Sequence, residues 1–171
     1  MSKMELEKFN LDQEIYIDSN IFTYVILENI EYLKTCTDFL KKVETGKINA
    51  VISPLVIDEV CFKIIVERLK YVLDVETNAH VFHKLKKKPE LLSKAKPELI
   101  TFLFIIENYK GLKILPVHSS STIKLFSRTL NDNMLPRDAL HLSVMDFYGI
   151  KNIATSDNDF ERIKEIKVWK P

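Results

Sequence analysis

Four acidic residues occupy positions where a predicted strand ends or a predicted helix begins. Asp18 closes the β-rich run IYID, and Asp157 follows the run KNIAT, which is also expected to be a strand. Asp138 lies in the first turn of an apolar helix, and Glu59 lies in the second turn of another. In open α/β sheets, ligands bind in the crevice beyond the carboxyl ends of the strands. We therefore expect the four carboxylates to gather at that crevice.

Carboxylates gathered at one edge of a sheet repel one another unless a cation lies between them. The hard cations Mg²⁺ and Mn²⁺, which prefer oxygen ligands, are the ions that such a site selects. A metal held in this way lowers the pKa of a bound water molecule and stabilises charge on a phosphodiester. The sequence has no Gly-rich phosphate loop, no G-x-S-x-G motif and no Cys/His pair at an informative spacing. The residues therefore predict metal-dependent hydrolysis of a phosphate ester.

Each of these acids also has a purely structural interpretation. An Asp in the first turn of a helix interacts favourably with the helix dipole, as Asp138 would. An Asp that follows a strand often caps the next helix, which fits both Asp18 and Asp157. The functional interpretation is preferred only because several carboxylates are expected at the same crevice.

The elements that position these acids alternate between strands and helices. Strands are expected at residues 15–18, 48–53, 111–117, 151–155 and 166–169. Helices are expected at residues 21–27, 31–43, 54–69, 119–130 and 136–148, with two more between 71 and 111. A helix that leads at once into a strand is half of a βαβ unit, which implies parallel pairing. The predicted fold class is α/β, a three-layer α/β/α sandwich around a mainly parallel sheet.

Length and composition predict one soluble domain. The chain has 171 residues, of which 46% are hydrophobic and 29% charged, as is usual for a globular protein. Its formal net charge of +1 provides no overall field that would attract nucleic acid or membranes. Cys36 and Cys61 lack metal-type spacing and are expected to be reduced thiols. The charged N-terminus does not resemble a signal peptide, and no apolar run is long enough to span a bilayer, so we expect a cytoplasmic protein without a membrane segment.

Residues 71–111 are expected to form a helical insertion within a single domain that covers residues 1–171. Six Lys lie between positions 84 and 96, against one acid, Glu90. Such a run is usually a solvated surface, but it also suits the phosphates of a polyanion. His80 and His83 have no third ligand nearby and are not expected to bind zinc. The candidate contacts to such a polyanion are Lys86, Lys87, Lys88 and Arg137.

Four segments and their order resemble the PIN-domain family, and within it the VapC-like toxins and related archaeal and bacterial PIN ribonucleases. The matching segments are YIDSN, SPLVIDEV, PRDALHLSV and TSDNDF, and the resemblance spans residues 15–169. The spacings S-x5-E and T-x-D-x-x-F are each moderately specific. Their joint occurrence in this order makes the resemblance specific.

The resemblance implies an α/β/α sandwich and an endoribonuclease that depends on Mg²⁺ or Mn²⁺. Asn20 and Thr155 would be supporting polar residues, and Asp159 would be an additional carboxylate. His141 follows the third acid by one helical turn, and we expect it to pack near the site without ligating the metal, because hard Mg²⁺ prefers oxygen. The catalytic and metal-binding acids implied by position are Asp18, Glu59, Asp138 and Asp157.

One neighbour competes for a place among these acids. Asp58 directly precedes Glu59, but the spacing from Ser53 favours Glu59 as the metal-binding residue.

The resemblance also implies partners and alternatives. The substrate would be RNA, and the chain would be the toxin of a type II toxin–antitoxin pair, with a small antitoxin protein as partner and a homodimer as its own state. The alternatives are a non-catalytic PIN scaffold or RNA-binding protein, and a metal-dependent phosphatase. The phosphatase is less favoured, because the haloacid-dehalogenase pattern needs a second Asp where Asn20 stands.

Overall fold

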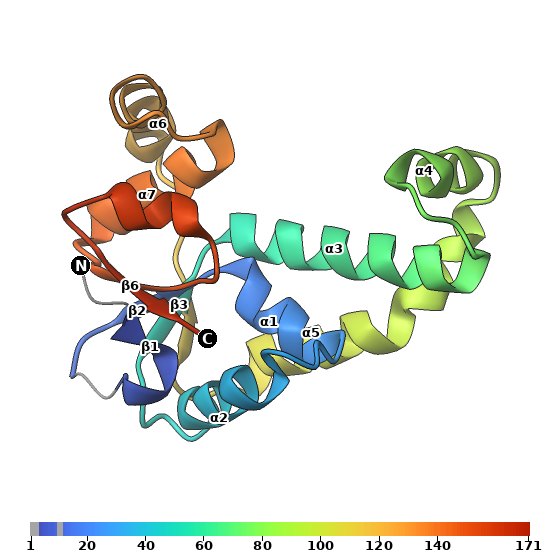
Figure 1. The fold of residues 1–171 in the computed structure, drawn as a ribbon, viewed down its shortest axis with the longest axis horizontal. Coiled ribbons are helices and arrows are strands. Elements are labelled where there is room, and N and C mark those ends of the chain that lie inside the picture. Colours follow the sequence, from blue (N-terminus) through green and yellow to red (C-terminus); the bar gives the residue numbers. More distant parts are fainter. Residues whose placement is uncertain (1–3, 10–11) are drawn as a thin grey trace.

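The computed structural model describes residues 4–9 and 12–171, and its strands form one sheet (Figure 1). The strands are β1 Met4–Glu5, β2 Ile15–Ile17, β3 Ala50–Ile52, β4 Leu112–Ile114, β5 Asn152–Ala154 and β6 Lys167–Lys170. Their spatial order is β1-β6-β5-β2-β3-β4, and every pair of these strands is parallel.

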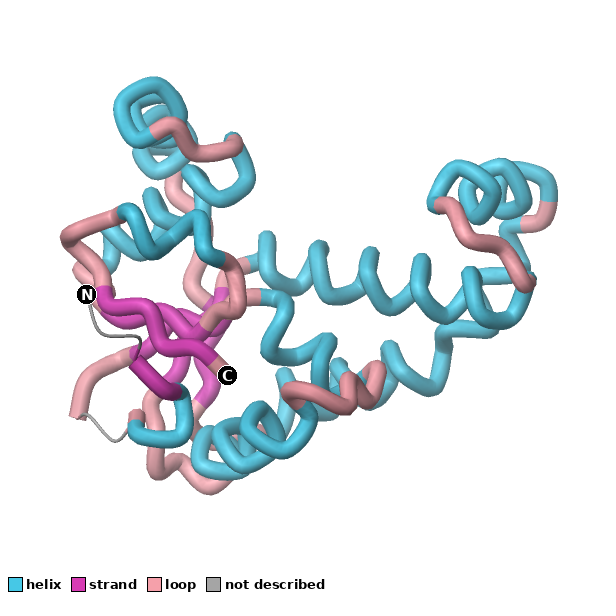
Figure 2. Tube along the Cα trace, viewed as in Figure 1, coloured by secondary structure: helices cyan, strands magenta, loops and turns pink. Residues whose placement is uncertain are grey.

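Helices lie on both sides of this sheet. The α-helices are α1 Ser19–Ile26, α2 Leu33–Glu44, α3 Pro54–Leu73, α4 Asn78–Lys87, α5 Lys96–Asn108, α6 Ser119–Asp132 and α7 Pro136–Tyr148, and the 3₁₀ helices are η1 Leu6–Lys8, η2 Pro89–Ala95 and η3 Asn158–Arg162. Figure 2 shows the strands as a central layer, with α6 and α7 on one side and α1 and α2 on the other. The predicted α/β/α sandwich is therefore confirmed. Within residues 4–9 and 12–171, no helix has both the length and the apolar content needed to cross a membrane.

β2 is the point from which the chain proceeds in opposite directions across the sheet. All residues of β2, β3 and β5 are buried, which explains why their sequences are short runs of mostly apolar residues rather than alternating patterns. The chain continues from β2 to β3 and β4 on one side, whereas β5 pairs with the other edge of β2. The carboxyl ends of β2 and β5 therefore flank the topological switch point, where open α/β sheets bind ligands.

Two parts of the predicted element order differ from the structure. The sequence pattern does not predict β1, because a strand of two residues is too short to show a period. The helix expected to begin at residue 71 begins only at Asn78, so that part of the prediction is wrong. α3 instead continues to Leu73 and ends at Asp74, whose φ of 48° is left-handed, and Thr77 caps α4. The left-handed Asp74 and the cap at Thr77 thus place the break between the two helices at residues 74–77 rather than near residue 70.

α3, α4 and α5 form an arm that extends away from the sheet. With 20 residues, α3 is about 30 Å long. Figure 1 shows α4 at the far end of the arm. α5 returns toward the sheet, where Phe102 packs on Phe22 of α1 with ring centroids 5.4 Å apart. The arm contains the segment 71–111, and its status as an insertion within one domain stays a prediction.

An ionic contact joins α6 to α7, the helix that carries Asp138 and His141. One guanidinium nitrogen of Arg128 lies 2.6 Å from Asp146 Oδ2 of α7, and another lies 2.7 Å from Asp132 Oδ2 of α6. Since Arg128 and Asp146 are both mostly buried, this pair fixes α6 on α7 more firmly than an exposed ion pair would.

Gly111 lies just before β4 at a position without room for a side chain. A Cβ there would overlap the carbonyl oxygen of Ile48 and lie 2.8 Å from that of Val43. Backbone atoms cannot rotate away, so we expect Gly111→Ala to lower the free energy of unfolding by about 3 kcal/mol.

The control is Gly149→Ala, because Gly149 has a φ of +71° but no atom within 4 Å of the place that a Cβ would occupy. Its left-handed backbone alone should cost about 1–2 kcal/mol. Urea unfolding measures both variants, and a loss at Gly111 no larger than that at Gly149 would contradict the close approach.

Candidate active site

Asp18 follows β2, and both of its carboxylate oxygens accept hydrogen bonds. Oδ1 accepts from the backbone N–H of Ser19 at 2.6 Å and from its hydroxyl at 3.3 Å. Oδ2 accepts from Asn20 Nδ2 and from Thr155 Oγ1, each at 2.6 Å. Asp18 therefore caps α1, as its structural interpretation predicts, and its carboxylate is held at the carboxyl end of β2.

Asn20 and Thr155 join the ends of β2 and β5. Asn20 Nδ2 donates to Thr155 Oγ1 at 2.9 Å, and Asn20 Oδ1 accepts from the backbone N–H of Ser156 at 3.3 Å. Thr155 Oγ1 also accepts from the backbone N–H of Asp157 at 3.0 Å. Both residues thus connect Asp18 with the loop that carries Asp157, and their supporting role in the reaction stays a prediction.

Glu59, rather than Asp58, lies on the buried side of α3. The side chain of Glu59 is 8% exposed and that of Asp58 is 72% exposed. Glu59 Oε1 lies 3.3 Å from both Arg137 Nε and His141 Nε2. Two side chains of α7 therefore approach the same oxygen of this carboxylate.

Positive and polar groups surround Glu59. Burial alone would raise the pKa of its carboxyl group. The contact with His141 at 3.3 Å acts in the opposite direction, as do the nearby Ser19 and the charge of Lys63, and together they hold the pKa of Glu59 below its usual range. Glu59 is therefore ionised and compensated by its neighbours.

Asp138, Asp157 and Asp159 form a second group of acids. One oxygen of each lies within 4.8 Å of the others. Burial is the largest cause of the raised pKa of Asp138, and the charges of Asp157, Asp18 and Asp159 raise it further. His141 partly offsets these effects, and the pKa of Asp138 is raised to about 6. Carboxylates that crowd without a cation between them behave in this way.

Lys170 holds the loop that carries Asp157 and Asp159. Its Nζ donates to the backbone carbonyl oxygens of Ser156, at 3.1 Å, and Asp157, at 2.8 Å, and also to Asn158 Oδ1 at 2.9 Å. Within the loop, the backbone N–H of Asp159 donates to Asp157 Oδ1 at 2.8 Å. Lys170 is buried, so the place of Asp157 depends on an ammonium group that the sequence pattern did not identify.

Two sets of side chains can hold a divalent cation. The aspartate set offers oxygen atoms alone, which suits Mg²⁺ and Mn²⁺, whereas the mixed set adds an imidazole nitrogen to two carboxylates. Asp159 pairs with Arg162 at 3.4 Å, but within the described chain no Lys or Arg forms an ion pair with Asp138 or Asp157. The aspartate set therefore has the greater need of a cation. The aspartate set is Asp138, Asp157 and Asp159, and the mixed set is Asp18, Glu59 and His141.

Three residues that were not predicted as catalytic or metal-binding are linked by hydrogen bonds beside the mixed set. Tyr16 Oη lies 2.6 Å from Ser53 Oγ and 2.8 Å from His141 Nδ1. His141 was expected near the site, and whether it ligates a metal stays a prediction. Tyr16 and Ser53 lie within the YIDSN and SPLVIDEV segments. No local pattern could link them to His141, because Tyr16 and His141 are 125 residues apart.

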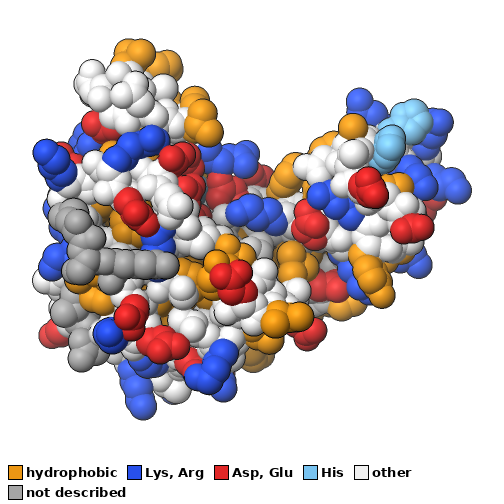
Figure 3. All heavy atoms as spheres, viewed as in Figure 1, with side chains coloured by type: hydrophobic (Ala, Val, Ile, Leu, Met, Phe, Trp, Pro, Cys, Tyr) orange, Lys and Arg blue, Asp and Glu red, His pale blue; other side chains and the backbone are white. Residues whose placement is uncertain are grey.

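The predicted RNA contacts lie in two separate places. Lys86 and Lys87 are in the last turn of α4, and Lys88 follows it; all three are exposed at the end of the arm, where Figure 3 shows basic side chains beside histidines. Arg137 lies instead beside Glu59. Of these four basic residues, the structure brings only Arg137 to the acidic edge.

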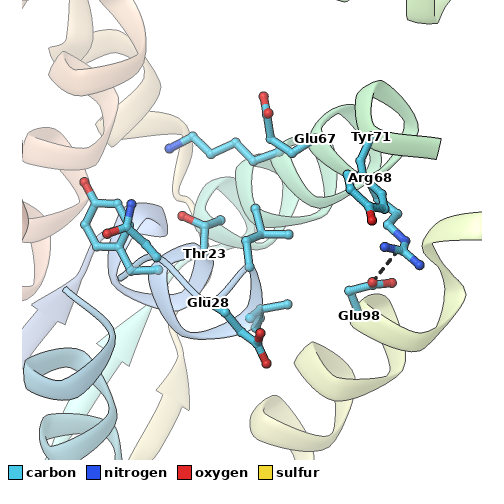
Figure 4. Close-up of a pocket in the computed structure, with 11 residues that line it drawn as sticks. Thr23, Glu28, Glu67, Arg68, Tyr71 and Glu98 are labelled. Carbon is cyan, nitrogen blue, oxygen red and sulfur yellow. Dashed lines mark ion pairs between the residues drawn. The ribbon is translucent and has the colours of Figure 1, made fainter. Parts of the chain in front are cut away.

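A cavity of about 720 Å³ lies between α1, α3 and α5, and none of the predicted acids lines it. Figure 4 shows Arg68 and Glu98 on the same side of the view, joined by an ion pair of 3.3 Å. Lys63 lines this cavity and donates to Ser19 Oγ at 2.9 Å, so the cavity adjoins the mixed set. The chemistry available to the molecule lies at the acidic edge rather than in this cavity.

Comparison with known proteins identifies a family and a similar fold. The model of the PIN domain family matches residues 15–166. Ribonuclease VapC2 of Methanocaldococcus jannaschii is 29% identical over 169 residues, which cover 98% of each chain. The crystal structure of VapBC2 from Rickettsia felis bound to a DNA fragment from their promoter contains a similar fold. Its TM-score is 0.56 at 16% identity, over 92% of this chain and 98% of that chain.

The raised pKa of Asp138 predicts a pH dependence of stability. Between about pH 4, the usual range for Asp, and about pH 6, the native protein retains a proton that the unfolded chain has already lost. This group therefore lowers the stability of the metal-free protein as the pH rises through that interval. Asp138→Asn cannot titrate, so its free energy of unfolding relative to wild type should increase from pH 4 to pH 6.

Urea unfolding at several pH values, with EDTA present, measures this difference. Asp38→Asn on α2, outside the acidic edge, is the control and should show no such trend. A stability difference between Asp138→Asn and wild type that stays constant with pH would contradict the crowding of Asp138.

Proposed function

The chain belongs to the PIN-domain family, and from this premise we propose that it is a divalent-metal-dependent endoribonuclease that hydrolyses RNA phosphodiester bonds. The observation that carries the proposal is that five carboxylates form two groups at the acidic edge: Asp18 and Glu59 beside His141 in one, and Asp138, Asp157 and Asp159 in the other. The name of the archaeal relative, a ribonuclease, supports the same activity.

We assign the metal to Asp18, Glu59, Asp138 and Asp157, with Asp159 as an additional carboxylate. The donor set is rich in carboxylate oxygen, which fits Mg²⁺ or Mn²⁺. When bound, such an ion supplies a more acidic water molecule and stabilises charge on the phosphodiester.

The side chains around these acids have separable tasks in this proposal. Asn20 and Thr155 orient Asp18 through the bonds described above. Arg137 and Lys63 offer positive charge beside Glu59, where the RNA backbone would meet the acidic edge. Without such cations, the carboxylates would repel a polyanionic substrate.

We further propose that the chain is the toxin of a type II toxin–antitoxin pair, with a small antitoxin protein as its partner. The relative is named VapC2 and the similar solved structure is a VapBC2 complex. Exposed apolar residues on α6 support a protein partner, since Ile123, Phe126 and Leu130 are 72%, 65% and 77% exposed at helical spacing. A homodimer and a cytoplasmic location belong to the same proposal.

The main alternative is a non-catalytic PIN scaffold or RNA-binding protein. A scaffold has no need of crowded, uncompensated acids, which reduce stability without a return in function. The phosphatase alternative is less favoured, because Asn20 stands where the haloacid-dehalogenase pattern needs a second Asp and the relative is named a ribonuclease.

Asp138→Asn tests the proposed activity, because it removes charge while nearly preserving shape. Mn²⁺ should raise the melting temperature of wild type by mass action, and the variant should lose most of this rise. Cleavage of single-stranded RNA should fall by more than about 100-fold, as expected for the loss of one group that stabilises transition-state charge. Folding without metal should be retained or improved.

The controls for this experiment are Asp38→Asn, which should behave like wild type, and EDTA, which should abolish cleavage. Wild-type protein that gains no stability from Mn²⁺ and cuts no RNA at any metal concentration would favour the non-catalytic scaffold.

A second variant tests the proposed RNA contacts at the end of the arm. Replacing the three Lys at 86–88 by Gln should weaken the binding of a long single strand. The slope of log affinity against log salt should become shallower by about 0.7 for each lost phosphate contact. An oligonucleotide too short to span the arm, about 30 Å, should bind and be cut as by wild type.

The matched control replaces Lys34, Lys41 and Lys47, on and just after α2, by Gln, with the same change in net charge. If both triple variants weaken binding equally, the arm makes no specific contact and only the overall charge matters.

A further inference from the structure

Three buried side chains form a hydrogen-bonded chain at the acidic edge. Tyr16 comes from β2, Ser53 precedes α3, and His141 lies on α7. Tyr16 and Ser53 are 0% exposed, and His141 is 2% exposed. Tyr16 Oη lies 2.6 Å from Ser53 Oγ and 2.8 Å from His141 Nδ1. The chain thus joins elements that carry acids of both sets.

Capping does not explain the side chain of Ser53. Ser is favoured at an N-cap because its hydroxyl accepts a hydrogen bond from the first turn of the helix. Ser53 occupies the N-cap of α3, but its side chain makes no cap hydrogen bond. The hydroxyl of Ser53 is directed to Tyr16 instead, so Ser53 contributes a hydrogen bond to the group that it forms with Tyr16 and His141.

The partners at the two ends fix the direction of the hydrogen bonds. The hydroxyl of Tyr16 has one proton to donate. Glu59 Oε1 can only accept, and it faces His141 Nε2 at 3.3 Å. Two acceptors would repel there, so Nε2 carries the proton. In the neutral imidazole, Nδ1 therefore accepts from Tyr16. Ser53 then donates to Tyr16.

We propose that Tyr16 and His141 are positioning residues for Glu59. The hydrogen bonds from Ser53 through Tyr16 fix the imidazole of His141 with its Nε2–H toward Glu59 Oε1. This contact sets the direction of the Glu59 carboxylate. This inference rests on the proposed function, in which Glu59 is a metal ligand. Arg137 approaches the same oxygen, so neither α7 side chain occupies the other one.

The contact between His141 and Glu59 is suited to tighten. Among the described residues, none gives Nε2 a hydrogen bond of good geometry, although the atom is buried. Hydrogen bonds at active sites are often long without ligand and shorten in the complex. A small turn of the Glu59 carboxylate would satisfy Nε2 and orient Glu59 at once.

Nitrogen-15 NMR of the full chain without metal measures the tautomer of His141. The sequence has four His, and His141→Asn assigns the relevant resonances. We expect an unprotonated Nδ1 and a protonated Nε2, with a shift of the Nδ1 resonance in Tyr16→Phe. A protonated Nδ1, or an Nδ1 resonance that Tyr16→Phe leaves unchanged, would overturn the proposal. This measurement does not depend on nuclease activity.

Metal binding tests the consequence for Glu59. Tyr16→Phe keeps the ring and removes the hydroxyl, so it should weaken Mn²⁺ binding about tenfold, the lower range for loss of an outer-shell partner. The Mn²⁺ concentration for half-maximal RNA cleavage should rise by the same factor, while kcat at saturating Mn²⁺ stays close to wild type. Ser53→Ala should act in the same direction and guards against poor folding of Tyr16→Phe.

The control is Tyr148→Phe, which removes a hydroxyl that donates to the Pro116 carbonyl at 3.0 Å, away from the acidic edge. Unchanged Mn²⁺ affinity in folded Tyr16→Phe and Ser53→Ala would overturn the positioning role while the proposed function stands. If wild type neither binds Mn²⁺ nor cuts RNA, the proposed function fails. The tautomer of His141 still decides whether the hydrogen bonds of Ser53, Tyr16 and His141 orient Glu59.

Discussion

Repulsion among carboxylates at the carboxyl edge of the sheet is the interaction that the surrounding structure has to balance. The parallel strand order brings these acids together, because the ends of β2 and β5 meet at the switch point and α3 begins beside them. Much of the local structure reduces the resulting cost. Asp18 accepts from backbone and side-chain donors, Glu59 has Arg137 and Lys63 nearby, and Lys170 fixes the loop after β5.

The compensation is unequal. The carboxylates of the mixed set have hydrogen-bond donors or positive charges beside them, whereas Asp138 remains hard to ionise within the aspartate set. A perturbed acid of this kind at a ligand-binding edge is typical of functional sites. Proteins keep a destabilising arrangement of this kind when the functional site needs it. Binding of a divalent cation would restore the lost stability.

The sequence predicts what leaves a local pattern. Local sequence patterns mark the buried strands, the Pro that begins α7 and the acids at strand ends. The fold class and the positions of the acids at strand ends and helix starts could therefore be predicted. The S-x5-E spacing also selected Glu59, which is buried, over the exposed Asp58. Contacts between distant residues leave no such pattern, as with Tyr16 and His141, 125 residues apart. The break between α3 and α4 was expected near residue 70 and lies at residues 74–77, because its place depends on the left-handed Asp74 rather than on the hydrophobic period.

The central claim is that the crowded acids are a cation site, and anomalous scattering from crystals of the full chain grown with Mn²⁺ tests it most directly. The account predicts an anomalous peak within bonding distance of carboxylate oxygens of the assigned acids, Asp18, Glu59, Asp138 and Asp157. Crystals at saturating Mn²⁺ with no peak at the acidic edge, or with a peak only at the exposed His80 and His83 of α4, would contradict it.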